Sequence, residues 1–340
     1  MHYLIAVAER VRVGQMQPRG AAVDGVGDDA QLLRIRRIGQ PAIHEIHALR
    51  PPAPGCRRSS ILSAASPQQN WSLSLSAISA EQRRHYDEQG FLVMPGFFAE
   101  AELAPWLQRF MDIVEERVAP APDMLVMRDV MVAKGVVEPG SKQEAIAKIQ
   151  DFHRDPPLFD GYCKHPRLLE VVAEFCGSDI KSIHNMLINK PPGVDGRHPL
   201  HQDLLYFPFR PAERIVATWT ALEPCTRENG CLVVVPGSHK GELLAHENPG
   251  WDYVNFLYVG AKGQGEGTDR QHLEMQPGDT VFFHPLLLHG SGRNRSDGFR
   301  RAISCHYAGA ECRYLKGLSP LPGDSRPYVL VQGREHSGCI

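Results

Sequence analysis

Apolar residues in the first patterned part of the chain recur at helical spacing. A capping box formed by Ser79 and Gln82 predicts a helix that begins there and ends at Gly90. A second helix is predicted by an apolar stripe that consists of Leu103, Trp106, Leu107, Phe110, Ile113, Val114 and Val118. A third helical pattern covers residues 168–175. Because amphipathic stripes are buried against other elements, these helices are expected to pack on a core.

The spacing then changes to short apolar runs that are separated by turn residues. Strands are predicted at 91–94, 183–188, 215–222, 231–235, 280–283 and 302–307. The pair Asn229-Gly230, which lies between two of these runs, predicts a hairpin. Many short strands with helices gathered before them indicate a mainly β fold, a sandwich or jelly roll, in which the helices cover one outer face.

The rest of the chain surrounds this patterned region. Residues 1–67 mix Arg, Gly, Ala and Pro without a sustained period, as is typical of a targeting or disordered leader. The expected organisation is a targeting or disordered leader over 1–70, one jelly-roll domain over 71–315 and a divergent C-terminal tail over 316–340. The glycine-rich stretch 260–267 lacks the strand before it and the helix after it that a nucleotide loop needs, so it is interpreted as a mobile loop.

Composition narrows the classes of protein that remain. With 340 residues, 42% of them hydrophobic, the chain can bury a sizeable core, and a net charge of −2 does not favour broad binding to nucleic acid or anionic membranes. There is no run of 18 apolar residues, so no membrane span is expected. The eight cysteines show no C-x-x-C spacing and are interpreted as reduced, buried thiols of an intracellular protein. Because the apolar start at 3–8 is short for a signal peptide, secretion is not expected.

The candidate chemistry begins with the segment Arg197-His-Pro-Leu-His-Gln-Asp203. His201 and Asp203 are two apart, so an extended strand would point both side chains to one face. Together with His289 they would form the two-histidine, one-carboxylate triad of non-haem Fe(II) oxygenases, which leaves metal positions open. Arg300 follows His289 in a strand that could pair with the strand ending at His289. Its guanidinium could clamp the distal carboxylate of 2-oxoglutarate.

The second histidine ligand has a competitor, because His284 precedes His289 by five residues. That offset puts the two side chains on opposite faces of any continuous strand, and Pro285 interrupts the pattern. His289 precedes Gly290, where the backbone can approach a cofactor closely. We therefore interpret His289 as the ligand and His284 as structural.

Residues 79–314 resemble the phytanoyl-CoA 2-hydroxylase (phytanoyl-CoA dioxygenase) family of Fe(II)- and 2-oxoglutarate-dependent oxygenases. The resemblance rests on long runs, namely Val126-Met-Arg-Asp129, Lys148-Ile-Gln-Asp-Phe152, Met186-Leu-Ile-Asn-Lys-Pro-Pro192, Arg197-His-Pro-Leu-His-Gln-Asp203, Tyr206-Phe-Pro-Phe-Arg-Pro211, Asn229-Gly-Cys-Leu-Val-Val234, Gly278-Asp-Thr-Val-Phe-Phe-His-Pro-Leu-Leu287 and Gly298-Phe-Arg300. The C-terminal segment after the Ala-Glu-Cys-Arg-Tyr run departs from the family pattern.

The resemblance implies a cupin-like jelly roll, also called a double-stranded β-helix, and a complete site. It assigns the iron to His201, Asp203 and His289, and the distal carboxylate of 2-oxoglutarate to Arg300 and Ser291. The remaining family positions in the co-substrate pocket correspond to Lys148, Met186, Gln202 and Trp219. Each has an alternative without function: Trp219 and Met186 could be ordinary core residues of a β-sandwich, and Lys148 could be an ordinary exposed lysine.

The resemblance also implies a reaction and a location. Its cofactors are Fe(II), 2-oxoglutarate and O₂, with ascorbate as reductant, and its substrate is a 3-methyl-branched acyl-CoA that is hydroxylated at C2 in fatty acid α-oxidation. Cations expected near the CoA phosphates are Lys142, Arg154, Lys190 and Arg210. Family members enter the peroxisome through an import receptor. Arg10-Val11 with Gln17 fits that N-terminal signal except at Pro18, and otherwise a cytoplasmic location is expected.

Two rival interpretations remain at this point. One is a jelly-roll binding protein without catalysis, against which the intact triad and Arg300 argue, because a binder has no use for an open iron position. The other is a related dioxygenase with a substrate other than acyl-CoA. Substrate choice depends on loops and pocket walls, which motif spacing does not describe.

Overall fold

The computed structural model describes residues 76–253, 255, 258–264, 269–315 and 329–333. The predicted leader lies outside these residues, as do the signal positions Arg10, Val11 and Gln17 and most of the predicted tail. The glycine-rich stretch 260–267 is described only in part. Within the described ranges, no helix is both long enough and apolar enough to cross a membrane.

An eight-stranded sheet forms one side of the core. In spatial order its strands are β1 (Phe91–Met94), β12 (Thr280–Phe283), β7 (Ile215–Ala221), β14 (Arg300–Gly309), β4 (Ile180–Lys190), β3 (Ile146–Gln150) and β2 (Leu125–Arg128), and β16 (Val329–Gln332) also pairs with β4. Every residue of the central strand β14 is buried, because the strand is covered on both faces. It therefore fixes the positions of the side chains that it carries.

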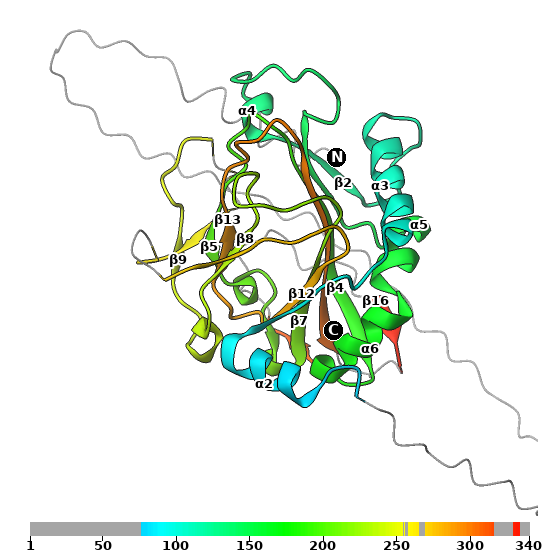
Figure 1. Ribbon diagram of the computed structural model, residues 1–340, viewed down its shortest axis with the longest axis vertical. Coiled ribbons are helices and arrows are strands. Elements are labelled where there is room, and N and C mark those ends of the chain that lie inside the picture. The colour runs from blue at the N-terminus through cyan, green and yellow to red at the C-terminus, as the bar shows by residue number, and fades with distance from the viewer. Residues whose placement is uncertain (1–75, 254, 256–257, 265–268, 316–328, 334–340) are drawn as a thin grey trace, which may run out of the picture. The chain divides into compact units, whose positions relative to one another are not determined.

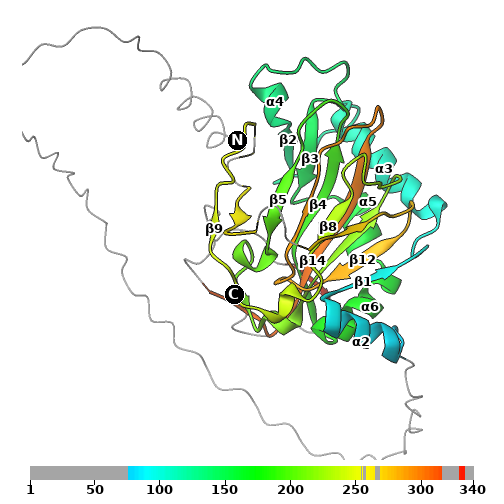
Figure 2. The ribbon, with the colours of Figure 1, turned by 60° about the vertical axis from the view of Figure 1, so that its left-hand side comes forward.

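A four-stranded sheet faces the large one (Figures 1 and 2). Its order is β11 (Gln271–Leu273), β8 (Leu232–Val234), β13 (His289–Ser291) and β5 (His198–His201). Apolar residues of the two sheets, among them Trp219, Val234 and Phe283, form a shared core cluster. Two short pairs complete the strands, β9 (His246–Glu247) with β10 (Gly260–Ala261) and β6 (Phe209–Arg210) with β15 (Arg313–Tyr314). The predicted jelly-roll class is confirmed.

The helices lie mainly on the outer face of the large sheet. Figure 1 shows α3 (Glu100–Val114), α5 (Pro156–Leu158) and α6 (Pro166–Cys176) on the side away from the small sheet. The predicted capping box opens α2 (Ala80–Gln89), and Gly90 ends it with φ 84°. Shorter segments are α4 (Val130–Ala133), the π-helical turn Phe159–Cys163 and the 3₁₀ turns Asp203–Leu205, Ala212–Arg214 and Ser238–Lys240.

Three local predictions are wrong. The second helix ends at Val114 rather than at Val118, because the chain turns at Glu116 with φ 61°, although Val118 still packs on the core. The turn at Asn229-Gly230 joins no hairpin, since β7 belongs to the large sheet and β8 to the small one. Arg300 does not lie on a partner strand of His289. Its strand β14 pairs with β4 and β7.

The cysteines that the structure describes fit the prediction of buried thiols. Cys163, Cys176, Cys225, Cys231, Cys305 and Cys312 are buried and form no disulfide.

Candidate metal centre and its pocket

The pairing of two short strands brings the two predicted histidine ligands together. In the antiparallel pair β5–β13, His201 lies directly opposite His289, and the ring centroids are 4.2 Å apart. Strand β5 ends at His201, so Asp203 begins a 3₁₀ turn instead of continuing the strand. The carboxylate nevertheless converges on the rings. One ligand atom from each of His201, Asp203 and His289 lies within 4.8 Å of the others, and all three residues are buried.

Hydrogen bonds fix which atoms of the triad face one another. Nδ1 of His201 lies 2.9 Å from the carbonyl of Pro199, and Nδ1 of His289 lies 3.0 Å from the carbonyl of Leu287. Because a carbonyl only accepts, each Nδ1 carries a hydrogen, and in the neutral ring the lone pair is then on Nε2. These Nε2 atoms lie 3.3 Å and 3.7 Å from Oδ1 of Asp203. With the lone pairs of both Nε2 atoms directed at this carboxylate oxygen, three electron-pair donors converge, as a bound cation requires.

The charge state of these groups also suits a metal. Burial lowers the pKa of His289 to about 4, so its ring is neutral at pH 7. Burial alone would raise the pKa of Asp203, but the neighbouring rings of His289 and His306 outweigh it and hold that pKa well below its usual range. The site therefore presents the neutral imidazole of His289 and the ionised carboxylate of Asp203, which are the protonation states in which these groups bind metal.

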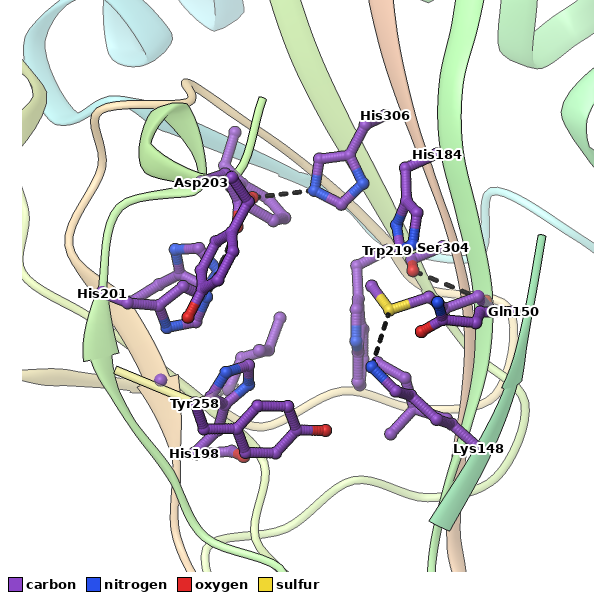
Figure 3. A pocket seen from close by; sticks show the side chains of 18 of the residues that line it. Lys148, Gln150, His184, His198, His201, Asp203, Trp219, Tyr258, Ser304 and His306 are labelled. Atoms are coloured by element: carbon purple, nitrogen blue, oxygen red, sulfur yellow. Dashed lines mark hydrogen bonds and ion pairs between the residues drawn. The ribbon is translucent and has the colours of Figure 1, made fainter. Parts of the chain in front are cut away.

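His306 holds the other oxygen of the carboxylate. Its Nε2 lies 2.8 Å from Oδ2 of Asp203, as the dashed line in Figure 3 marks, so Oδ1 is left to face the two histidines. His306 lies on β14 and is buried. Its role was not predicted from the sequence. Alternate residues of a strand share one face, so Ser304 and His306 share the face of Arg300. Both line the pocket.

A cavity of about 160 Å³ opens beside the triad, between the two sheets. Figure 3 shows His201 and Asp203 on one side of the open space, and Trp219, Gln150 and Lys148 on the opposite side. Arg300 also lines the cavity, 5.5 Å from the ring of Trp219, and is only 2% exposed. Its Nε and Nη1 are buried and have no hydrogen-bond partner in the described part of the chain. A buried guanidinium with free donors needs an anionic ligand.

The structure gathers most of the remaining predicted site residues around this cavity. Lys148, Met186, Trp219 and Ser291 line it together with the triad and Arg300.

Gln202 does not line the cavity. Its side chain points away and bonds to backbone groups of Glu242, Leu286 and Leu244.

His284 also lies outside the site. Its Nδ1 accepts a hydrogen bond from the backbone of Leu286, which fits the structural role that the sequence suggested.

A stack of rings backs one of the ligands, and the sequence did not indicate it. His198 stacks on His201 with centroids 4.1 Å apart, and Tyr258 stacks on the other face of His198 at 4.0 Å. Lys148 lies over the ring of Tyr258 at 5.3 Å. His198 belongs to the same motif as His201, but only the fold shows that the two rings are parallel. The stack limits rotation of the His201 ring.

Comparison with known proteins adds a family to this geometry. Residues 86–302 match the family model described as Phytanoyl-CoA dioxygenase (PhyH). A probable phytanoyl-CoA dioxygenase of Caenorhabditis elegans is 53% identical over 248 residues, which are 71% of this chain and 78% of that protein. The peroxisomal phytanoyl-CoA dioxygenase of Homo sapiens is 47% identical over 270 residues, which are 77% of this chain and 79% of that protein.

Solved structures agree on the fold. EctD from S. alaskensis, crystallised with 2-oxoglutarate and 5-hydroxyectoine, has a TM-score of 0.58 at 20% identity, over 80% of this chain and 89% of that chain. The epimerase SnoN in complex with Fe³⁺ and alpha ketoglutarate has a TM-score of 0.55 at 20% identity, over 76% of this chain and 95% of that chain. With the family match over most of the described domain, and with a His-Asp-His donor set, the chain belongs to the phytanoyl-CoA dioxygenase family of iron- and 2-oxoglutarate-dependent oxygenases.

Proposed function

We propose that this chain hydroxylates C2 of a 3-methyl-branched acyl-CoA such as phytanoyl-CoA, a step of fatty acid α-oxidation. The observation that carries the proposal is the convergence of three metal-binding atoms in one cavity with Arg300, whose buried Nε and Nη1 have no hydrogen-bond partner among the described residues. The substrate class is supported by the relatives named phytanoyl-CoA dioxygenase, which are 47–53% identical to this chain.

Each residue around the cavity would have a separate task. His201, Asp203 and His289 would hold Fe(II), and the side of the triad that faces the cavity would remain open. Arg300, with Ser291, would take the distal carboxylate of 2-oxoglutarate. When bound, iron and 2-oxoglutarate supply the oxidation of the substrate C–H bond by O₂, and succinate and CO₂ are the other products.

Four further residues would shape the pocket for the co-substrate. Trp219 is 3% exposed and lies next to Arg300, so it would keep water from the ion pair between the guanidinium and the carboxylate. Lys148 and Met186 contact each other, with Nζ 3.8 Å from Sδ, and would border the other end of the ligand. Gln202 would act at a distance, because its three backbone contacts fix the turn that carries Asp203.

The cellular setting is proposed from the same relatives. Ascorbate would keep the iron in its reduced state. Peroxisomal import would bring the chain to the compartment that the human relative's name states. The N-terminal signal that matches except at Pro18 would have to be read by an import receptor.

The test is a titration of the protein with Fe(II) and 2-oxoglutarate without oxygen, followed by addition of O₂. Succinate and 2-hydroxyphytanoyl-CoA are quantified with and without phytanoyl-CoA. We expect succinate and the hydroxylated thioester to form in equal amounts. The variant Asp203→Ala should lose both products, and His284→Gln, which changes a histidine outside the cavity, should keep them.

The other results lead to different conclusions. Succinate without the hydroxylated thioester would retain a dioxygenase but assign it another substrate. No iron-dependent product from folded protein would favour the non-catalytic binding protein.

A further inference from the structure

Two buried cations lie side by side in the wall of the cavity. Lys190, the last residue of β4, is paired in register with Arg300, the first residue of β14. Lys190 is 3% exposed and Arg300 is 2% exposed, and both line the cavity. Neither forms an ion pair among the described residues. The acid closest to Lys190 in sequence, Asp195, is already paired with Arg197 at 2.6 Å and with Arg293 at 3.0 Å.

Such an arrangement is unfavourable unless an anion completes it. Burial, together with the neighbouring Arg300, lowers the pKa of the Lys190 ammonium well below its usual range. Taking a charged group out of water without a partner is costly, and a second charge of the same sign adds to the cost. A single guanidinium can already hold a carboxylate with two hydrogen bonds, so the second buried cation, Lys190, needs an explanation of its own.

The contacts of Lys190 supply that explanation. Its Nζ donates to Oγ of Ser291, at 2.9 Å, and to the carbonyl of Gly292. A bound anion would favour the charged form of Lys190, which only donates, and the oxygen of Ser291 is then the acceptor in this bond. The hydroxyl hydrogen of Ser291 is therefore left to donate to another group, and Ser291 lines the cavity. Lys190 thus orients the hydroxyl as well as contributing charge.

The lysine is held firmly in this position. A Cβ atom at Gly196 would lie 3.3 Å from Cγ of Lys190, and a Cβ atom at Gly230 would lie 3.1 Å from its Cδ. Gly230 also has φ 84°, which favours glycine. Two glycines therefore make room for the aliphatic part of the side chain, as expected of a pre-formed site rather than of a mobile surface lysine. The sequence-based assignment of Lys190 to the CoA phosphates does not fit a residue this buried.

We propose that Lys190 is a positioning residue for the distal carboxylate of 2-oxoglutarate: it adds a second positive charge beside Arg300 and turns the Ser291 hydroxyl towards that carboxylate. The consequence is selectivity for 2-oxo acids that have a second carboxylate. This proposal rests on the proposed use of 2-oxoglutarate, but not on the identity of the acyl substrate.

The test compares two ligands of equal chain length in the Fe(II) protein without oxygen. The dissociation constants of 2-oxoglutarate and of 2-oxopentanoate, which lacks the distal carboxylate, are measured from the visible absorption of the iron–oxo acid chelate. For Lys190→Met we expect the constant for 2-oxoglutarate to rise about tenfold or more, and the constant for 2-oxopentanoate to change less than about twofold. Affinity for Fe(II) should not change.

Further variants keep the result interpretable. Ser291→Ala should weaken the binding of 2-oxoglutarate in the same way. The double variant should lose less affinity than the product of the two single fold-changes, because both substitutions remove the same hydrogen-bonded arrangement. Lys181→Met is the matched control, since Lys181 is a buried lysine of the same strand that does not line the cavity. If Lys190→Met does not fold, Lys190→Gln takes its place.

Two outcomes would overturn the proposal. One is a Lys190 variant that binds 2-oxoglutarate as tightly as the unchanged protein. The other is an equal loss of affinity for both oxo acids, which would mean general damage to the site. An unchanged protein that shows no preference for 2-oxoglutarate over 2-oxopentanoate would instead count against the proposed function.

Discussion

Asp203 shows how much of this site depends on single atoms. Its Oδ1 faces the two imidazoles, while its Oδ2 is held 2.8 Å from Nε2 of His306. A carboxylate that is free to rotate would exchange these roles and would be a poorer ligand. His306 therefore fixes the ligand without being one.

This contact predicts the effect of replacing His306. His306→Leu should weaken Fe(II) binding about 10- to 100-fold, the usual effect of removing a group that orients a metal ligand. His306→Gln, which keeps an N–H donor, should recover part of the affinity. Fe(II) affinity is measured by competition with a coloured chelator. His272→Leu, a change at an exposed histidine of β11, is the control. An unchanged affinity in His306→Leu would contradict this role.

At this scale the sequence revealed residue types but not their alignment. His201, Asp203, His289 and Arg300 could be predicted, because their chemistry and order are specific. His306 was within reach, because it shares the face of Arg300 on the predicted strand 302–307, whereas the pairing of Lys190 with Arg300 depends on the register between β14 and β4. Gln202 was misplaced for a related reason. Successive side chains of an extended segment point to opposite faces, so Gln202 points away from the cavity-facing His201 and Asp203. It points towards the backbone groups with which it forms hydrogen bonds.

At the scale of the element, the short pair β5–β13 determines whether the metal ligands meet. Gly290 lies between His289 and Ser291, and a Cβ atom there would be 2.7 Å from the carbonyl oxygen of His198 and 3.0 Å from that of Pro199. Both obstacles are backbone atoms, so they cannot rotate away. The two strands can approach this closely only because residue 290 is glycine.

Gly290→Ala should therefore separate the two strands. We expect Fe(II) affinity to fall by at least about tenfold and the free energy of unfolding to fall by about 1–3 kcal/mol, as in other overpacked cores. Metal competition and denaturant unfolding measure the two effects. Gly298→Ala is the matched control, because a Cβ atom there would meet nothing within 4 Å. Equal behaviour of the two variants would show that β13 can shift without harm.

The sequence predicted where many helices and strands lie, but not which strands pair. The capped helix α2 and the runs that became β1, β7, β12 and β14 were found because their local patterns are strong. The pairing of strands was not found, because partners such as β13 and β5 are far apart in sequence and only three or four residues long. The wrong hairpin at Asn229-Gly230 has the same origin. The turn is real, but the chain crosses there from one sheet to the other.

For the whole molecule, buried neutral histidines make stability depend on pH. Burial lowers the pKa of His284 and of His289 to about 4, whereas an unfolded chain binds the proton near 6.5. Between these values the unfolded state carries protons that the folded state does not. Stability therefore rises with pH through this window and is lost as the pH falls from about 6.5 to about 4.

The metal-free protein should show this loss directly. In the presence of a chelator we expect the free energy of unfolding to fall between pH 6.5 and 4, by up to about 3 kcal/mol for each such histidine. His284→Gln, whose amide oxygen can still accept the hydrogen bond from Leu286, should reduce the slope. Denaturant titrations at several pH values measure it. A slope that is the same in His284→Gln and in the unchanged protein would exclude His284 as a cause.

The division of the site between two sheets has a mechanical consequence. His201 and His289 belong to the small sheet, whereas Arg300, Lys190 and Trp219 belong to the large one. A co-substrate that reaches from the metal to Arg300 would connect the two sheets. It would act in parallel with the Lys190–Ser291 hydrogen bond between them and with the His306–Asp203 hydrogen bond, which ties the large sheet to the turn after β5. The distance between the two sheets would then select the length of the 2-oxo acid. A shorter or longer acid could bind at both ends only if the sheets moved together or apart.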